Sequence, residues 1–169
     1  MLYTSNFTTP LGAMQSCASD RGLCLLEFTD RPSLPQEIAT LETHFKVNCT
    51  VGTNPHLQLL ERELAQYFAG KLINFTVPLD LSAGTPFQRS VWEVLLTIPL
   101  GQTTSYGHLA KRLGNSGASQ AVGSANGSNR LAIVVPCHRV VGTGGKLTGY
   151  AGGLERKKWL LRHEGALMF

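Results

Sequence analysis

The sequence predicts an α+β protein of two units, the first mixing short strands with helices and the second mainly helical. Three observations support this prediction. Strand-like runs around a turn open the chain, helix N-terminal signals recur from residue 54 onward, and the charge balance changes near residue 83. With 169 residues, 43% of them hydrophobic, the chain can form two small domains that each hold a core. We expect these domains at residues 1–80 and 84–169, joined by a linker around residues 77–84.

The first half is expected to be a small α/β scaffold, because its sequence shows no catalytic or metal-binding motif. Leu11–Ala18 and Leu23–Phe28 are strand-like and flank a polar turn that contains glycine, which predicts a hairpin. Apolar residues at helical spacing predict a helix over Pro35–Phe45. A second helix is expected to begin at the cap Asn54, with Pro55 as its first helical residue, and to end near Gly70.

The second half begins with a strong helix signal, because Thr85-Pro86-Phe87-Gln88 is a capping box with proline at the first helical position. Helices are then expected over Thr104–Leu113 and Ala118–Asn126, joined by a short turn that contains glycine, as in a helix-turn-helix. Almost every residue of the second of these helices is small, so its backbone can approach another surface, including a DNA minor groove. A connector helix of low stability is the alternative. The last helix is expected over Leu154–Glu164.

The net charge of +4 is distributed unevenly between the two halves of the chain. Residues 1–83 carry five Lys and Arg against eight Asp and Glu, whereas residues 84–169 carry ten against three. A basic half indicates an anionic partner, of which nucleic acid is the commonest, and a solvated basic surface is the alternative.

The most informative stretch is Ile133–Val141. An apolar run of strand type leads into Pro136-Cys137-His138-Arg139, which places a thiol beside an imidazole and a guanidinium. A cysteine thiol has a pKa near ~8.5, and a neighbouring histidine and positive charge lower that pKa and favour the nucleophilic thiolate. The alternative is a thiol that is merely buried, since cysteine is among the most buried residue types.

Metal, phosphate-loop and membrane functions are not expected. The remaining cysteines and the histidines of the first half lack the close pairing of zinc ligands, so we expect no metal and no cofactor. The glycine-rich stretch Gly142–Thr148 has Leu147 where a phosphate loop needs Ser or Thr. No apolar run is long enough to cross a membrane, and no signal peptide is visible. We therefore expect a cytoplasmic protein whose cysteines are free thiols.

Several motifs of the second half occur together in a fixed order. They are Ser105-Tyr106, Ala121-Val122-Gly123, Asn129, Pro136-Cys137-His138-Arg139-Val140, Gly149-Tyr150-Ala151-Gly152-Gly153 and Trp159-Leu160-Leu161-Arg162-His163-Glu164-Gly165. Together they resemble the O6-alkylguanine-DNA alkyltransferase family, also called methylated-DNA–protein-cysteine methyltransferases, and within it the bacterial single-function branch. The first half resembles the family only loosely.

This resemblance implies a ribonuclease-H-like N-terminal cap and a mostly helical, winged-helix-like C-terminal domain with a helix-turn-helix. The implied activity is DNA repair by direct damage reversal in a suicidal, single-turnover reaction without a cofactor. A monomer would bind double-stranded DNA in the minor groove, flip out the O6-alkylguanine and take its alkyl group onto Cys137. Whether O4-alkylthymine is also a substrate stays open.

The resemblance also implies a role for each site residue. Cys137 would be the alkyl acceptor, and His138 would act through a water as its base, oriented by Glu164. Asn129 would hold the turn before the acceptor, and Tyr106 would donate a hydrogen bond to the flipped base. The backbone at Cys137 and Val140 would accept from the guanine amino group, the Ala151 amide would face O6, and Tyr150 would form a wall of the pocket. The residues expected on DNA are Ala118, Ser119, Gln120, Ala121, Ala125 and Arg139.

One position departs from the family pattern, because Gln120 stands where the family has an arginine that fills the gap left by the flipped base. The shorter, uncharged side chain predicts weaker binding to damaged DNA. A lesion-binding relative without repair activity is the alternative function, but such proteins replace the acceptor cysteine, and Cys137 is present. A Cys-His-Glu hydrolase is a third possibility, for which no oxyanion hole is visible.

Overall fold

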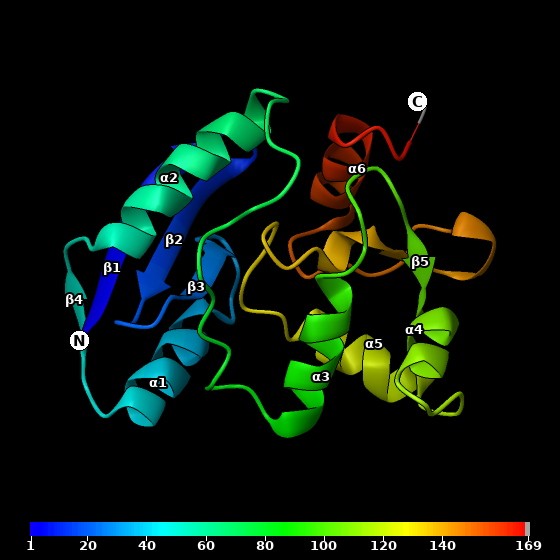
Figure 1. Cartoon of the computed structure of the whole chain (residues 1–169), viewed down its shortest axis with the longest axis horizontal. Helices are drawn as coiled ribbons and strands as arrows, with labels where there is room; N and C mark the ends of the chain where they lie inside the picture. The colour runs from blue at the N-terminus through cyan, green and yellow to red at the C-terminus, as the bar shows by residue number, and fades with distance from the viewer. Residues whose placement is uncertain (168–169) are drawn as a thin grey trace. The chain divides into compact units, whose positions relative to one another are not determined.

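The computed structural model describes residues 1–167 of the chain. The chain forms two compact units, Met1–Ala83 and Gly84–Phe169 (Figure 1). The first unit combines a sheet with helices and the second is mainly helical, so the predicted α+β class is confirmed. None of the helices within residues 1–167 has the length and apolar character needed to span a membrane.

A four-stranded sheet forms the centre of the first unit. Its strands are β1 (Leu2–Thr9), β2 (Gly12–Ala18), β3 (Leu23–Phe28) and β4 (Cys49–Val51), in the order β3-β2-β1-β4. The predicted hairpin is confirmed, because β2 and β3 pair antiparallel around a turn closed by the Ser19 amide on the Gly22 carbonyl at 2.9 Å. β4 pairs parallel to β1 at the edge of the sheet.

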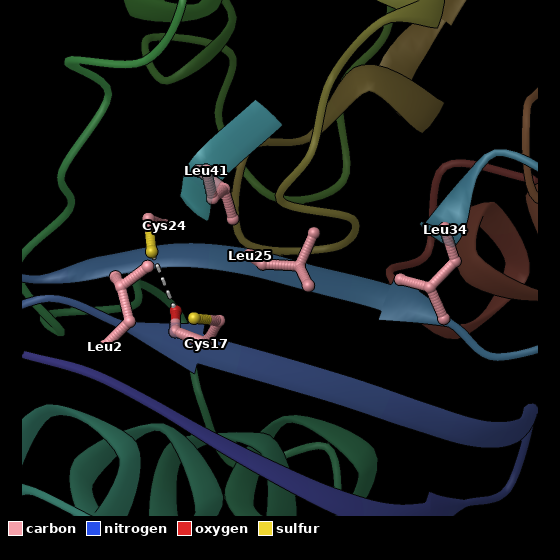
Figure 2. Close-up of a cluster of buried hydrophobic side chains, with 6 residues drawn as sticks. All are labelled: Leu2, Cys17, Cys24, Leu25, Leu34 and Leu41. Carbon is pink, nitrogen blue, oxygen red and sulfur yellow. Dashed lines mark hydrogen bonds between the residues drawn. The ribbon is translucent and has the colours of Figure 1, made fainter. Parts of the chain in front are cut away.

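Two helices pack on this sheet: α1 (Leu34–Phe45) contacts β3, and α2 (Pro55–Phe68) contacts β2. The predicted cap of α2 is confirmed, since the Asn54 side chain accepts a hydrogen bond from the Leu57 amide at 3.0 Å. Figure 2 shows the core between α1 and the sheet, where the Cys24 thiol points at the Cys17 carbonyl, 3.3 Å away. The buried side chains drawn there are Leu2, Cys17, Cys24, Leu25, Leu34 and Leu41.

The second unit consists of short helices and one small parallel sheet. Its elements are α3 (Pro86–Leu95), β5 (Thr104–Ser105), α4 (Tyr106–Arg112), α5 (Ser119–Gly127), the 3₁₀ turn η1 (Cys137–Arg139), β6 (Val140–Val141), the 3₁₀ turn η2 (Thr143–Gly145) and α6 (Leu154–His163). Both halves of the capping box predicted at Thr85 and Gln88 are formed. Helices α4 and α5 pack together as the predicted helix-turn-helix. Thr104 and Ser105 belong to a strand rather than to the helix, and Ser105 caps α4 by accepting from the His108 amide at 3.1 Å.

The tryptophan of α3 connects this helix to α5. Trp92 is buried, its indole N–H donates to the Ala125 carbonyl at 2.9 Å, and the Arg130 guanidinium lies 5.6 Å from its ring centre. Gly84 lies so close to the same ring that a Cβ at this position would be 2.4 Å from a ring carbon. The N-terminal end of the unit is therefore packed directly on Trp92.

The predicted strand before the Pro-Cys-His corner is wrong. Residues 132–134 form a turn, and Ile133 has a left-handed φ of 72°. Such a conformation is unusual for a β-branched residue and costs about 1–3 kcal/mol, so other contacts must hold it. Asn129 supplies them. Its side chain accepts from the Leu131 amide at 2.9 Å and donates to the Val135 carbonyl at 2.9 Å.

Candidate active site

Cys137 lies in a pocket of about 330 Å³ within the second unit. It is the first residue of η1, and only 6% of its surface is exposed. The pocket walls come from α4, α5, η1 and the loop that precedes α6, in the form of Tyr106, Gly123, Asn126, Gly127, Cys137, Gly149, Tyr150 and Ala151. The thiol that follows the turn 132–134 therefore lies in a pocket and not in a packed core.

Asn129 touches the thiol as well as the turn. Its Nδ2 lies 3.1 Å from the Cys137 sulfur, in addition to its bonds to the Leu131 and Val135 carbonyls. An amide N–H directed at sulfur stabilises the thiolate more than the neutral thiol, because hydrogen bonds to an ionised acceptor are the stronger ones. The same side chain therefore fixes the turn and favours the nucleophilic form of Cys137.

His138 is completely buried beside the pocket and is held by Glu164. Its Nε2 lies 2.7 Å from Glu164 Oε2. A carboxylate can only accept, so Nε2 carries the proton and Nδ1 has a bare lone pair. Nδ1 is buried and has no hydrogen-bond partner within residues 1–167. Burial lowers the pKa of His138 below its ordinary value, and the bond to Glu164 opposes this effect without reversing it. His138 is therefore neutral near pH 7, and its Nδ1 can accept a proton.

Glu164 binds two groups at once. Its Oε1 accepts from Arg139 Nε at 2.7 Å, while Arg139 Nη1 donates to the Ile98 carbonyl, also at 2.7 Å. Burial would raise the pKa of Glu164, but the His138 hydrogen bond and the Arg139 guanidinium outweigh burial and lower this pKa to about 2. Glu164 thus stays ionised under all ordinary conditions and fixes the His138 tautomer.

The expectation that Arg139 contacts DNA finds no support in its position, because its guanidinium is buried and bonded to Glu164 and Ile98. Ala125 is also buried, and its carbonyl accepts from Trp92 and Ser128. In contrast, Gln120 and Ala121 are exposed in the first turn of α5, and Ala118 and Ser119 are half-buried at its start. The accessible part of the expected DNA set is therefore the N-terminal turn of α5.

Most of the residues expected to contact the base line the pocket. Tyr106 and Ala151 line it together with Tyr150. The Tyr106 ring lies against Gly123, where an added Cβ would be 3.7 Å from the ring. Val140 is buried, and its carbonyl accepts from Lys157. Within residues 1–167, no three His, Cys, Asp or Glu side chains are grouped so that they could hold a metal ion.

Comparisons with known proteins agree with this geometry. The family model for the 6-O-methylguanine DNA methyltransferase DNA-binding domain matches residues 86–166, and the model for the ribonuclease-like domain of the same family matches residues 2–81. The chain belongs to the O6-methylguanine DNA methyltransferase family.

Individual relatives support the same assignment. A Salmonella typhimurium methylated-DNA–protein-cysteine methyltransferase is 46% identical over 99% of this chain and 98% of its own length. A Shigella flexneri protein of the same name is 58% identical, but that match covers 64% of each chain. The solved structure of Mycobacterium tuberculosis OGT in complex with DNA is 41% identical with a TM-score of 0.82, covering 97% of this chain and 93% of the other. The O6-methylguanine-DNA methyltransferase of Pyrococcus kodakaraensis is 31% identical with a TM-score of 0.66, covering 98% of this chain and 99% of the other.

Two buried residues of this methyltransferase site are not among those predicted from the sequence. Lys157 is fully buried, and its Nζ donates to the Val140 carbonyl at 2.6 Å and the Thr148 carbonyl at 2.8 Å. Burial lowers the pKa of Lys157 to about 8, although Cys137 opposes this. The spacing of the sequence could have predicted that Lys157 is buried, because it shares the apolar face of α6 with Leu160 and Leu161.

Asn126 is the second such residue. It lines the pocket from α5, is buried, and donates from Nδ2 to the Cys137 carbonyl at 3.4 Å. Its position four residues after the buried Val122, on the same side of the helix, is the signal that could have identified it.

Proposed function

We propose that this chain repairs alkylated DNA by transferring the alkyl group from O6 of guanine to its own Cys137, once per molecule. One observation carries the proposal. The Cys137 thiol lies in a pocket with an N–H of Asn129 on its sulfur, beside a neutral His138 whose Nδ1 is bare. Membership of the methyltransferase family supports the same reaction.

The proposed step is an in-line displacement. A water molecule passes the thiol proton of Cys137 to His138 Nδ1, and the thiolate attacks the alkyl carbon on O6. The new sulfur–carbon bond forms as the carbon–O6 bond breaks, and that electron pair stays on the base. The base takes up a proton, which balances the thiol proton held on His138, and remains in the DNA as guanine. The thioether is stable, so the protein is consumed.

The neighbouring residues support this step in different ways. Glu164, kept ionised by Arg139, stabilises the imidazolium that forms on His138. Asn129 stabilises the attacking thiolate and holds the turn. Tyr106, on the pocket wall, is the proposed hydrogen-bond donor to the departing base. The backbone at Cys137, Val140 and Ala151 and the ring of Tyr150 are proposed to hold the guanine.

The alkylated base is stacked inside the duplex, so it must be rotated out before it can enter the pocket. We assign DNA binding to the domain of residues 84–169 and a scaffold role to residues 1–80. The excess of Lys and Arg in the former supports contact with phosphates. Gln120 and its neighbours at the start of α5 are the proposed minor-groove contacts. All four cysteines are thiols, which supports a reducing cytoplasmic setting. The proposed acting species is a monomer.

One experiment tests this proposal. The protein is incubated with a duplex that carries O6-methylguanine with a radiolabelled methyl group, and the label is traced to a peptide. Transfer of the label to Cys137 is expected. DNA binding without transfer would instead favour a lesion-binding function, and label released into water would indicate a hydrolase.

A further inference from the structure

One edge of strand β1 in the first unit is only partly covered. Strand β4 pairs with β1 along Leu2–Thr4 and ends there, where the Gly52 amide donates to the Thr4 carbonyl at 3.1 Å. β1 itself continues beside β2 as far as Thr9. Residues 5–9 of β1 therefore have a neighbouring strand on one side only.

The alternation of the backbone identifies the groups that are left open. Successive residues of a strand direct their N–H and C=O to opposite edges. Thr4 directs its carbonyl to the β4 side, so Asn6 and Thr8 direct their backbone groups to that side as well. Ala13, opposite Thr8 in β2, agrees with this, because its carbonyl accepts from Thr29 and not from β1. At the β4 side no backbone group of residues 1–167 pairs with Asn6 or Thr8, and both residues are exposed. Such an unpaired edge is a template for another strand.

A pocket of about 340 Å³ lies at the same end of β1. Its walls come from the end of β1, the turn after it and one face of α2, and consist of Phe7, Thr8, Thr9, Pro10, Glu61, Leu64, Ala65 and Phe68. Most of these residues are apolar, and the only charged one among them is Glu61, which is exposed. Thr8 belongs both to the open edge and to the pocket wall, so the two features are continuous.

One kind of ligand satisfies all of these groups. Open strand groups bind a peptide backbone, an apolar pocket binds an apolar side chain, and a carboxylate binds a basic side chain. We propose that the first unit binds an extended peptide segment of a partner protein, which adds a strand to β1 at Asn6 and Thr8, buries an apolar side chain in the pocket and places a basic side chain at Glu61. This role is separate from alkyl transfer, because every residue that lines the Cys137 pocket belongs to the second unit.

The spacing within α2 defines the pattern of the peptide. Glu61 and Ala65 are separated by four residues of helix, a rise of about 6 Å. Two residues along a strand span about 6.6 Å and lie on the same face. A basic residue two positions from the apolar one therefore reaches Glu61 when the apolar side chain lies over the small Ala65. A lysine on both sides of the apolar residue suits a peptide that runs in either direction.

Fluorescence anisotropy with the labelled peptide Thr-Lys-Thr-Phe-Thr-Lys-Thr tests the proposal on the full chain. The lysines and the phenylalanine share one face of this peptide when it is extended. The wild type should bind it saturably, with a Kd below about 1 mM. Alanine in place of the phenylalanine should weaken binding at least about tenfold. Two further peptides are N-methylated at alternate residues, one on each set of backbone nitrogens. Only the set that faces β1 should lose binding, by at least about tenfold relative to the other, because only that set forms the strand ladder.

Substitutions at the edge and at the pocket give matched pairs. Thr8→Pro removes an N–H that does not pair with β2, a position where a strand tolerates proline, and should weaken binding at least about fivefold. Thr8→Val keeps the N–H and should bind like the wild type. Glu61→Lys should weaken binding about threefold to tenfold at low salt, whereas Glu93→Lys, at an exposed position of α3, should not.

Three results would overturn the inference. The first is the absence of saturable binding to the wild type. The second is equal affinity of the two N-methylated peptides, which decides the matter even if thermal melting shows that Thr8→Pro does not fold. The third is self-association of the protein in sedimentation without peptide, lost in Thr8→Pro, which would assign the edge to a second copy of the chain. Methyl transfer to Cys137 should be unchanged in Thr8→Val and Glu61→Lys, so the proposed function is tested separately.

Discussion

Replacement of Glu164 by glutamine tests the buried network beside the thiol. The carboxylate accepts from His138 and from Arg139, both at 2.7 Å, and the Arg139 guanidinium has no other ionised partner among residues 1–167. Glu164→Gln leaves this guanidinium buried without a counter-charge. Breaking a buried ion pair from one side costs about 3–5 kcal/mol, so the free energy of unfolding of the second unit should fall by that amount.

The pH dependence of this loss has a definite sign. Glu164 has a pKa of about 2 in the folded chain against an ordinary value of 4.5. The difference contributes ~3 kcal/mol of stability, which is fully present above pH 4.5 and is lost as the pH falls toward 2. The variant lacks this carboxylate, so the gap in stability between wild type and variant should narrow through that range.

The variant should also transfer alkyl groups more slowly. The glutamine amide can donate to His138 Nε2, which moves the imidazole proton to Nδ1 and removes the acceptor nitrogen. Loss of a correctly oriented base slows a reaction by roughly 10²–10⁴-fold.

The assay is unfolding in urea at pH 7 and at pH 3, followed by tryptophan fluorescence. Trp92 and Trp159 are the only tryptophans and both belong to the second unit, so the signal reports on that unit alone. Glu155→Gln, at an exposed position of α6, is the control and should change stability by less than about 1 kcal/mol. Equal stability of Glu164→Gln and wild type at pH 7, or a gap that is the same at pH 3, would refute the reasoning.

Three other substitutions give distinct results. Gly84→Ala places a Cβ 2.4 Å from a ring carbon of Trp92 and should destabilise the second unit by ~1–3 kcal/mol. The control Gly107→Ala has nothing within 4 Å of the added Cβ and should leave the stability of this unit unchanged or slightly raised. Equal midpoints of urea unfolding for the two variants would contradict this expectation. Gln120→Arg adds a positive charge and reach at the exposed start of α5 and should tighten binding to a damaged duplex in fluorescence anisotropy; equal affinity and transfer rate would count against the assigned role of this position. Tyr106→Phe removes the proposed donor to the departing base and should slow single-turnover transfer by about 10²-fold while DNA binding is kept, and an unchanged rate would remove Tyr106 from the mechanism.

Elements with a local signal could be predicted from the sequence. The caps at Asn54 and Thr85 form as expected, because each needs only a side chain and an amide three residues later. The hairpin of β2 and β3 and the helix pair α4 and α5 are likewise set by turn residues between periodic segments. These features depend on contacts within a few residues.

Features that depend on distant contacts could not be predicted in the same way. The β-branched run at Ile133 predicts a strand, but the Asn129 side chain outweighs this propensity and folds the run into a turn. The basic Arg139 suggests a DNA contact, yet its partner Glu164 is 25 residues away in the chain. Lys157 is buried for a similar reason, because it binds carbonyls of β6 and of the loop before α6.

The central claim is that Cys137 is the single alkyl acceptor, and stoichiometric labelling tests it most directly. Hydrogen bonding to Cys24 raises the pKa of Cys17, and burial raises that of Cys49 to about 12, so both remain protonated thiols. With an excess of the labelled O6-methylguanine duplex, we expect incorporation to stop at one methyl group per chain, all of it on the peptide that contains Cys137, and none in Cys137→Ala. Label on another cysteine, or turnover beyond one methyl group per chain, would contradict this account.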